Sequence, residues 1–266
     1  MIFRLTIPRA AFYLTALFLF HSCEETATRI NRESATDLNK DTVKSEKVKV
    51  EDDLPLILNQ ENHQEFLSNY FKEDKSRKIA LSTRLGTLKI KLYEETPIHT
   101  ANFLMLTERE YFNNTEFTRV VKNFVVQGGN NDKEEEEIKR LLIGNYEMKP
   151  EMNEKLIHKK GALAMARRYE ENPEMLSSAY NFYLVHGQTF NEPQLIALER
   201  EHEMIIPEWK RKIYKTIGGA PHLDGKHTVI GEIYEGFDVL DKMASVKTDK
   251  SDWPLKPLIM EVKIID

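Results

Sequence analysis

The chain has very little cysteine: Cys23 is its only one in 266 residues. A single thiol cannot form a disulfide within the chain, so packing alone must hold the folded part together. An excess of basic residues is also lacking. Lys and Arg number 38 against 43 Asp and Glu, and the formal net charge of −5 argues against a general nucleic-acid binder. With 41% hydrophobic residues, the composition is still that of a globular protein with a core.

Several common catalytic motifs are absent too. The sequence has no phosphate-binding loop and no serine-nucleophile motif. Its later histidines, at positions 186, 202, 222 and 227, do not have the spacing of a zinc site. We therefore expect a protein that needs no metal and no cofactor.

The N-terminus has the pattern of an export signal. Arg4 and Arg9 precede or begin an apolar run at 10–20, which has the length of a signal-peptide core and is too short to span a bilayer as a mature helix. Ser22 and Cys23 follow, and a small residue before Cys at this point resembles a bacterial lipobox, although Phe20 and His21 depart from it. We expect lipidation at Cys23. The alternative is plain secretion, with Cys23 an incidental thiol of the signal peptide.

The charge pattern divides the chain further. Residues 24–53 are polar and charged, and such a segment cannot bury enough apolar surface to offset its ordering entropy. Phe66, Leu67, Tyr70 and Phe71 then recur at helical spacing. The expected layout is a signal peptide at 1–22, a lipid-anchored flexible tether at 23–53, an N-terminal helical extension at 54–77 and one domain at 78–266.

Within that domain, short strands dominate. The run at 87–92 alternates strictly, with Leu88, Ile90 and Leu92 on one side, which is typical of a half-buried strand. Thr96 and Pro97 predict the start of a helix at 97–110, and a second helix is expected at 236–244. Further strands are predicted at 79–83, 117–121, 124–127, 161–166, 181–185, 228–233 and 258–264. Many short strands with few helices indicate a barrel or a sandwich.

Two long segments interrupt this pattern and are read as insertions. Residues 130–160 include four consecutive Glu at 134–137, which we interpret as a solvated face rather than a metal site. Residues 188–216 combine Pro193, an apolar series and Trp209, which predicts one or two helices packed on the barrel edge.

The most informative segment reads FTRVVKNFVVQGG at 117–129. Strand alternation places Arg119 on the same face as Phe117 and Val121. Alone, such an Arg is more often an edge residue that reaches water. Phe124, Gln127 and the following glycine pair make a binding role the better interpretation.

This segment resembles the hallmark of the cyclophilins. Three more blocks are similar to cyclophilin elements in the same order: GALAMA at 161–166, NFYLV at 181–185 and LDGKHTVIG at 223–231. The resemblance covers roughly residues 78–266. It implies an all-β fold, a closed eight-stranded antiparallel barrel with two capping helices, here with helical insertions. It also implies a groove that binds proline-containing polypeptides and accelerates rotation about Xaa-Pro bonds.

The resemblance assigns roles residue by residue. Arg119, Phe124 and Gln127 would form the catalytic set, with the Arg119 guanidinium at the prolyl nitrogen and Gln127 holding it. The substrate-binding residues would be Val125, Ala166, Asn181, Tyr183, His222, Leu223 and His227, the two histidines near the rim. Val125, Tyr183, Asn181 and His222 depart from the usual Met, Phe, Gln and Trp. The Arg, Phe and Gln set is intact, so activity is expected.

Taken together, these patterns predict a monomeric peptidyl-prolyl cis-trans isomerase that acts on exported proteins and assists their folding. A lipid anchor would hold it in the bacterial cell envelope, facing the periplasm or the surface. The alternative is a cyclophilin-fold peptide-binding or chaperone module with weak or no catalysis. A third hypothesis is that the helices of 188–216 form a partner site. No nucleic-acid partner is expected.

Overall fold

The computed structural model describes residues 56–73, 75–130 and 133–266. The predicted signal peptide and tether, with the predicted lipidation site Cys23, lie outside the described residues. Within the described ranges, no helix has both the length and the apolar character needed to cross a membrane.

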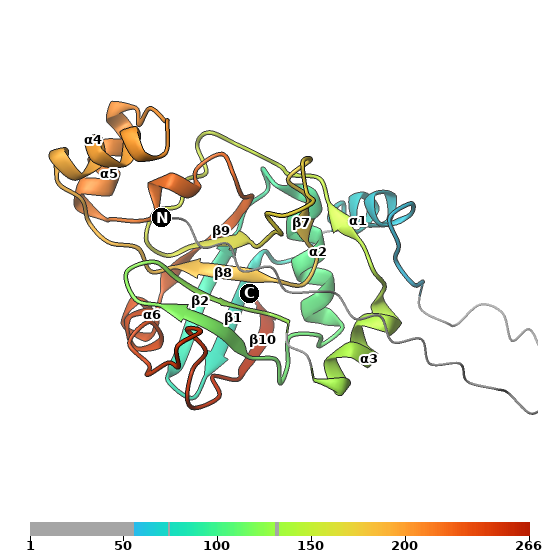
Figure 1. The fold of residues 1–266 in the computed structure, drawn as a ribbon. Coiled ribbons are helices and arrows are strands. Elements are labelled where there is room, and N and C mark those ends of the chain that lie inside the picture. Colours follow the sequence, from blue (N-terminus) through green and yellow to red (C-terminus); the bar gives the residue numbers. More distant parts are fainter. Residues whose placement is uncertain (1–55, 74, 131–132) are drawn as a thin grey trace, which may run out of the picture. The chain divides into compact units, whose positions relative to one another are not determined.

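The centre of the fold is an eight-stranded sheet in the order β10-β1-β2-β9-β6-β8-β4-β3, with antiparallel neighbours throughout (Figure 1). Its strands are β1 (Lys78–Thr83), β2 (Gly86–Leu92), β3 (Phe117–Val121), β4 (Val125–Gly128), β6 (Ala162–Met165), β8 (Phe182–Val185), β9 (Val229–Glu235) and β10 (Met260–Ile265). Strands β5 (Glu147–Met148) and β7 (Ser177–Ser178) form a separate two-stranded ribbon. The predicted antiparallel eight-stranded architecture is confirmed.

The two edge strands of this curled sheet meet only at their ends. Glu116 and Ile259 form a single bridge, and the Phe117 N–H donates to the Leu258 carbonyl at 3.0 Å. Further along β3, the Val120 N–H donates instead to the carbonyl of Asp252, at 2.8 Å. The sheet is therefore a nearly closed barrel and not the closed one that was predicted. A continuous β3–β10 ladder would need the β3 edge, but Asp252 of a loop bonds that edge instead.

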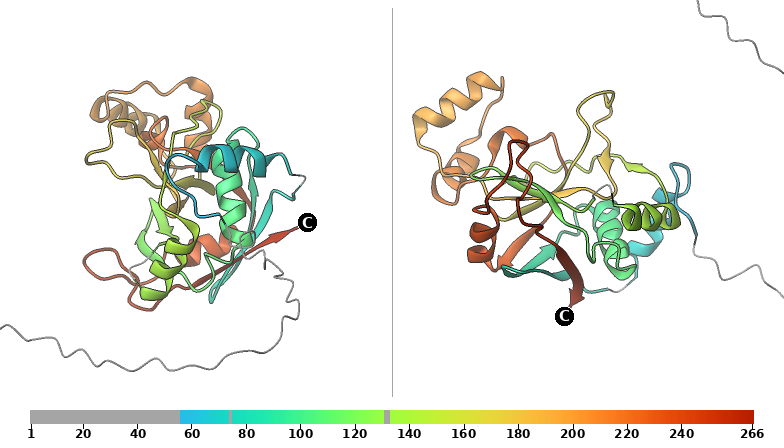
Figure 2. Two further views of the ribbon diagram at one scale, coloured as in Figure 1. Left: turned by 90° about the vertical axis from the view of Figure 1, so that its right-hand side faces the viewer. Right: turned by 60° about the horizontal axis from the view of Figure 1, so that its bottom comes forward.

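Six helices and one short 3₁₀ turn lie around the described sheet: α1 (His63–Phe71), α2 (Pro97–Glu108), α3 (Glu134–Ile143), α4 (Glu192–Glu201), α5 (Glu208–Thr216), η1 (Pro221–Leu223) and α6 (Phe237–Met243). The helices expected near 97–110, 236–244 and within 188–216 are all present. Figures 1 and 2 show α4 and α5 together at the end of the sheet opposite α1 and α3. The helical segment at 188–216 is thus separated from the N-terminal extension.

The start of α2 depends on a residue far away in the sequence. Thr96 stands at the N-cap position with Pro97 after it, as expected, but the Thr96 side chain makes no capping hydrogen bond. The Glu151 carboxylate accepts from the N–H groups of Ile98 and His99, at 3.1 and 2.9 Å, and from His99 Nδ1 at 2.6 Å. A carboxylate is favourable at a helix N-terminus because it complements the helix dipole and the unpaired N–H groups.

The sheet buries both of its faces, against two different sets of apolar residues. The main core includes a group of aromatic rings, in which Phe182 lies 5.3 Å from Phe103 and 5.4 Å from Phe112 between ring centroids. The opposite face carries a second cluster, made up of Val125, Ala162, Ala164, Ala166, Tyr183, Val185, Ala220, Leu223 and Val229. Strand alternation produces this division, since successive side chains point to opposite faces.

A β-bulge in β3 changes one expectation. The register with β4 pairs Phe117 with Gly128 but Arg119 with Gln127, so one extra residue lies between them on β3. Phe117 is fully buried in the main core, and Arg119 lies on the other face. The prediction that these two side chains share a face is wrong, because the bulge breaks the two-residue alternation.

Candidate active site

Four side chains form a row across the sheet face that carries the second cluster. In the strand register, Arg119 lies opposite Gln127, Gln127 opposite Tyr183, and Tyr183 opposite Ala164. Directly opposed residues of antiparallel strands project from the same face and contact one another. The structure therefore brings together Arg119, Gln127 and Tyr183, which are far apart in the sequence.

Phe124 stands at the turn between β3 and β4, beside this row. Asn123 precedes it with a φ of 64°, the left-handed conformation that Asn tolerates better than most residues. The Phe124 carbonyl accepts from the N–H groups of His186 and Gly187, both at 3.0 Å, and the Asn123 N–H donates to His186 Nδ1 at 2.9 Å. These bonds fix the backbone of Phe124, while its partly buried ring packs on the second cluster.

The predicted wall of the proline pocket is almost entirely buried. Val125, Tyr183 and Leu223 are 2%, 3% and 6% exposed and belong to the second cluster, as does Ala166. Asn181 is partly exposed, and both its backbone and side-chain N–H groups donate to Ser178 Oγ, at 3.1 and 3.4 Å. An apolar surface with a polar amide beside it is what an extended peptide with a proline ring requires.

The Arg119 guanidinium lies at the edge of this apolar surface. Its central carbon is 5.8 Å from the centroid of the Phe124 ring, and its Nε is 3.6 Å from Asp252 Oδ2. Within the part of the chain that the structure describes, no side-chain hydrogen bond joins Arg119 to Gln127. Gln127 is the cross-strand neighbour of Arg119, and the carboxylate that forms an ion pair with the guanidinium is that of Asp252.

The Tyr183 hydroxyl points into the protein and has a partner. It lies 3.0 Å from His158 Nε2, and the fully buried His158 ring lies with its Nδ1 at 3.1 Å from Asp224 Oδ1. Burial raises the pKa of Tyr183 well above its usual value, so its hydroxyl stays protonated in its pairing with His158 Nε2. Burial would raise the pKa of Asp224, but the hydrogen bonds from His158 and Lys210 outweigh it and lower that pKa.

The two histidines that were predicted near the rim lie in different environments. His227 is buried: its Nε2 is 2.7 Å from the hydroxyl of Tyr169, and its Nδ1 is 3.2 Å from the Met165 carbonyl. Burial lowers the pKa of His227 to about 4, so it is neutral at pH 7. His222 is partly exposed, and its ring stacks on Phe124 at 5.3 Å between centroids.

Three residues at this site escaped the sequence reasoning, namely His158, Tyr169 and Asp252. Asp252 comes from the loop before β10, and nothing in its local sequence relates it to Arg119. His158 is a lone histidine before a strand, which by pattern is no more than a core residue. Only the Leu-Asp-Gly block at 223–225 hinted that Asp224 belongs near the site.

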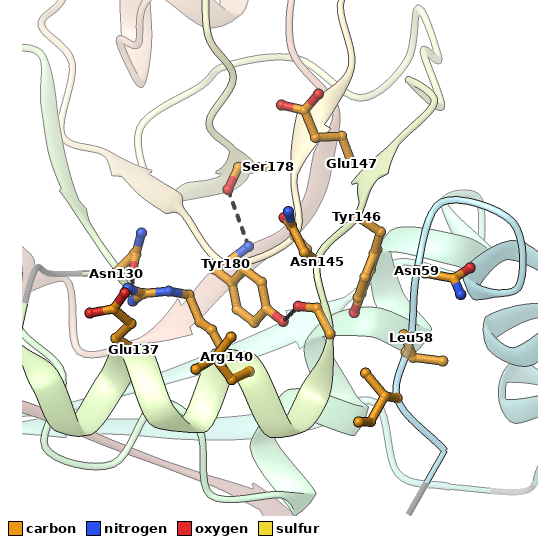
Figure 3. A pocket seen from close by; sticks show the side chains of 14 residues that line it. Leu58, Asn59, Asn130, Glu137, Arg140, Asn145, Tyr146, Glu147, Ser178 and Tyr180 are labelled. Carbon is orange, nitrogen blue, oxygen red and sulfur yellow. Dashed lines mark hydrogen bonds between the residues drawn. The ribbon is translucent and has the colours of Figure 1, made fainter. Parts of the chain in front are cut away.

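A separate cavity of about 610 Å³ lies between the residues before α1, helix α3 and the β5–β7 ribbon (Figure 3). Arg140, Tyr146 and Tyr180 line it, and the Tyr180 hydroxyl donates to the Gly144 carbonyl. None of the predicted site residues lines this cavity. In the described ranges, no group of three or more His, Cys, Asp or Glu could hold a metal ion.

Comparison with known proteins shows the family of this chain. The family model described as cyclophilin type peptidyl-prolyl cis-trans isomerase/CLD matches residues 78–264. A peptidyl-prolyl cis-trans isomerase of Arabidopsis thaliana is 28% identical over 191 residues, which cover 71% of this chain and 93% of the relative. A peptidyl-prolyl cis-trans isomerase-like protein of Neurospora crassa is 29% identical over 189 residues, 70% of this chain and 90% of the relative.

Solved structures show the same fold. A cyclophilin type peptidyl-prolyl cis-trans isomerase of Cryptosporidium parvum, crystallised in the presence of the dipeptide Ala-Pro, aligns with a TM-score of 0.50 at 22% identity. The alignment covers 71% of this chain and 99% of that one. Because the family model matches well over half of its residues, this chain belongs to the cyclophilin type peptidyl-prolyl cis-trans isomerases.

Proposed function

We propose that Arg119, at the edge of the second cluster, is the group through which this isomerase accelerates rotation about Xaa-Pro bonds. Amide resonance gives the peptide bond a rotation barrier of about 18–20 kcal/mol. Uncatalysed Xaa-Pro isomerisation therefore takes tens to hundreds of seconds, which is slow enough to limit folding. The substrates are proline-containing segments of polypeptides.

No bond has to be broken in this reaction, so neither a nucleophile nor a metal is needed. As the Xaa-Pro bond twists, resonance is lost and a lone pair develops on the prolyl nitrogen. The guanidinium of Arg119 is charged at every working pH and offers planar N–H donors that can stabilise this lone pair. The stabilisation is electrostatic and preorganised, because strand β3 holds the donor beside the Phe124 ring before the substrate arrives.

The observation that carries this proposal is the position of a permanent cation beside an apolar wall. The partly buried Phe124 ring offers an apolar surface that the buried Val125 and Leu223 back. The centre of the Arg119 guanidinium lies 5.8 Å from the centroid of that ring. A proline ring packed on this surface would place its nitrogen within reach of Arg119. Gln127 and Asn181, on the same side, are the candidates for hydrogen bonds to the substrate backbone.

The test is an isomerisation assay on a short Xaa-Pro peptide, by exchange spectroscopy, with the wild-type protein and two variants at the same position. Arg119→Ala should reduce kcat/KM by about 10²-fold or more, in the range of losses for a removed transition-state donor. Arg119→Lys should recover little, because Lys is a point charge without the planar fork. Arg84→Ala, at the exposed β1–β2 turn, is the matched control and should behave as wild type. Equal rates for wild type and Arg119→Ala would contradict the proposal.

We further propose that the clients are exported proteins and that the protein works in a bacterial cell envelope as a lipid-anchored monomer. The support is the sequence alone: the basic N-terminus, the apolar run at 10–20 and the position of Cys23. Two or more acyl chains at Cys23 would make attachment to a membrane stable. Mass analysis of the mature N-terminus tests this, and a mature chain that keeps residues before Cys23 or lacks lipid there would contradict it.

One observation favours a second candidate, a peptide-binding or chaperone module with weak catalysis. The Asp252 carboxylate competes with a substrate for the guanidinium of Arg119. If the protein is such a module, wild type and Arg119→Ala should bind an unfolded client with the same affinity. Neither should isomerise the peptide faster than the uncatalysed rate in buffer. That pair of results would replace the isomerase proposal by this one.

A further inference from the structure

The helical segment at 192–216 is a hairpin that stabilises itself. Asn191 and Gln194 form a reciprocal capping box at the start of α4, and Arg211 of α5 forms ion pairs with Glu192 and Glu199 of α4. Its apolar side is buried in a small cluster of Ile157, Phe190, Leu195, Ile206 and Tyr214. Residues on this hairpin therefore have defined positions.

The turn after α4 is held as tightly. The N–H of Ile206 donates to the Glu199 carboxylate at 2.7 Å, and the N–H of Met204 donates to the Glu199 carbonyl at 3.0 Å. His202, at the C-cap of α4, donates its own N–H to the Leu198 carbonyl at 3.0 Å. The ring of His202 is thus presented from a rigid backbone.

Helix α5 docks the hairpin on the active-site side of the fold. The Tyr214 hydroxyl lies 2.9 Å from both carboxylate oxygens of Asp224, and Lys210 Nζ lies 2.9 Å from Asp224 Oδ2. Asp224 continues the contact to His158, which in turn bonds the Tyr183 hydroxyl. A buried hydrogen-bonded chain therefore connects the hairpin to the wall of the predicted proline pocket.

A stack of rings makes a second and more direct connection. His202 stacks on His222 with centroids 5.1 Å apart and planes at 17°, and His222 stacks on Phe124 at 5.3 Å and 24°. The Arg119 guanidinium lies against the same Phe124 ring. The hairpin thus reaches the catalytic set through two successive ring contacts.

His222 has little else to hold it. Its Nδ1 is buried without a hydrogen-bond partner, and among the described residues no hydrogen bond fixes its ring. Burial, together with the nearby His202, Lys226 and His158, lowers the pKa of His222 to about 4 against the opposing effect of Glu201. A neutral ring at pH 7 without hydrogen bonds depends on stacking for its orientation.

We propose that His202 is a positioning residue for the isomerase: by stacking on His222, it holds the Phe124 ring as one wall of the proline site. The hairpin of α4 and α5 then completes the active site from outside the eight-stranded sheet. This inference rests on the proposed function. Without the His202 ring, one face of the His222 ring would be open to water. His222 would then be free to turn, and the Phe124 ring would no longer be held by the stack.

The test compares three variants on the same Xaa-Pro peptide. His202→Ala removes the stack and should lower kcat/KM by about 3- to 10-fold, mainly through a higher KM, in line with the modest strength of a ring pair. His202→Phe keeps a ring of similar width and should restore most of the wild-type value. Arg200→Ala, two residues earlier at an exposed position of α4, should leave both constants unchanged.

Each outcome decides the question. The thermal midpoints of the three variants should agree, which separates positioning from loss of fold. A His202→Ala protein as active as wild type, or a His202→Phe protein as poor as His202→Ala, would overturn the role of His202. If Arg119→Ala is inactive in the same assay, the proposed function stands and only this inference falls. If wild type is no faster than Arg119→Ala, both fall.

Discussion

At the scale of single residues, the main electrostatic feature of the candidate site is the permanent positive charge of Arg119 and the carboxylate near it. Arg119 and Asp252 lie 3.6 Å apart, and their side chains are 43% and 45% exposed. Exposed pairs of this kind contribute little to stability, about 1 kcal/mol at most. Asp252 also adopts a φ of 64°, an uncommon conformation that places its carbonyl on the Val120 N–H. The Asp252 side chain therefore acts on the site through its charge, while its backbone carbonyl is a structural contact of β3.

The first prediction concerns this carboxylate. Asp252→Asn should raise kcat/KM for a neutral peptide by about 2- to 5-fold, because the guanidinium no longer has a competing anion near it. Asn tolerates a positive φ, so the backbone contact should survive. The gain should shrink at high salt, since screening weakens the ion pair in the wild type. A loss of activity would mean that Asp252 aligns Arg119 rather than competing for it; Asp238→Asn on α6 is the control.

The second prediction separates the ring of Tyr183 from its hydroxyl. Tyr183→Phe leaves the apolar wall in place but deprives the buried Nε2 of His158 of its hydrogen-bond partner. An unsatisfied buried polar atom costs about 1–3 kcal/mol. We expect the free energy of unfolding in urea to fall by that amount, with kcat/KM changed less than 3-fold relative to wild type. Lost activity at unchanged stability would instead assign the hydroxyl a catalytic role.

At the scale of elements, backbone groups at the ends and edges of helices and strands are hydrogen-bonded by residues that are distant in the sequence. The N-terminus of α2 is capped by Glu151 from the segment before β6, and the edge of β3 is occupied by the loop residue Asp252. Loop residues thus supply hydrogen bonds that the residues of the helix or strand itself do not provide. The same holds for the hairpin of α4 and α5, which is docked through Asp224.

The third prediction contrasts the two residues that could cap α2. Glu151→Ala removes a carboxylate that accepts two backbone N–H groups and the buried His99 ring, and should destabilise the protein by about 2–4 kcal/mol. Thr96→Ala should cost less than about 1 kcal/mol, because Thr96 makes no capping bond. Urea unfolding followed by circular dichroism measures both. The reverse order of the two losses would show that local capping prevails at this helix.

At the scale of the whole molecule, buried titratable groups make stability depend on pH. His222 and His227 have pKa values lowered to about 4 by burial, whereas an unfolded His titrates near 6.5. Between these values the unfolded chain binds protons that the folded protein does not, so stability falls as pH drops from about 6.5 to about 4. Asp224, whose folded pKa is lowered, adds a further loss as pH falls through that pKa.

The fourth prediction follows from these signs. The thermal midpoint should be nearly constant from pH 8 to pH 7 and should fall steadily from pH 6.5 to pH 4.5. His227→Gln loses the ring contacts with Tyr169 and Met165, so it should be less stable than wild type at pH 7. Because Gln cannot take up a proton, its stability should decline less steeply as the pH falls. Scanning calorimetry at a series of pH values measures both curves. Parallel curves for the two proteins would exclude His227 as a source of the pH dependence.

Local patterns in the sequence account for much of this architecture. The alternation of Leu88, Ile90 and Leu92 is reproduced as three fully buried side chains of β2, and the helix after Thr96 and Pro97 begins where it was expected. The four ordered blocks predicted the family, which the comparisons confirm. These features could be read from the chain because periodicity and family motifs are properties of contiguous residues.

What only the tertiary structure decided are contacts between residues distant in sequence. A bulge placed Arg119 on the face opposite Phe117, and loops placed Asp252 beside Arg119, His158 under Tyr183 and His202 on His222. No repeating pattern encodes these meetings, because each depends on the paths of loops and on how two elements dock. The sequence by itself determined the strands, the family and the catalytic candidates; folding decided which charges and rings surround them.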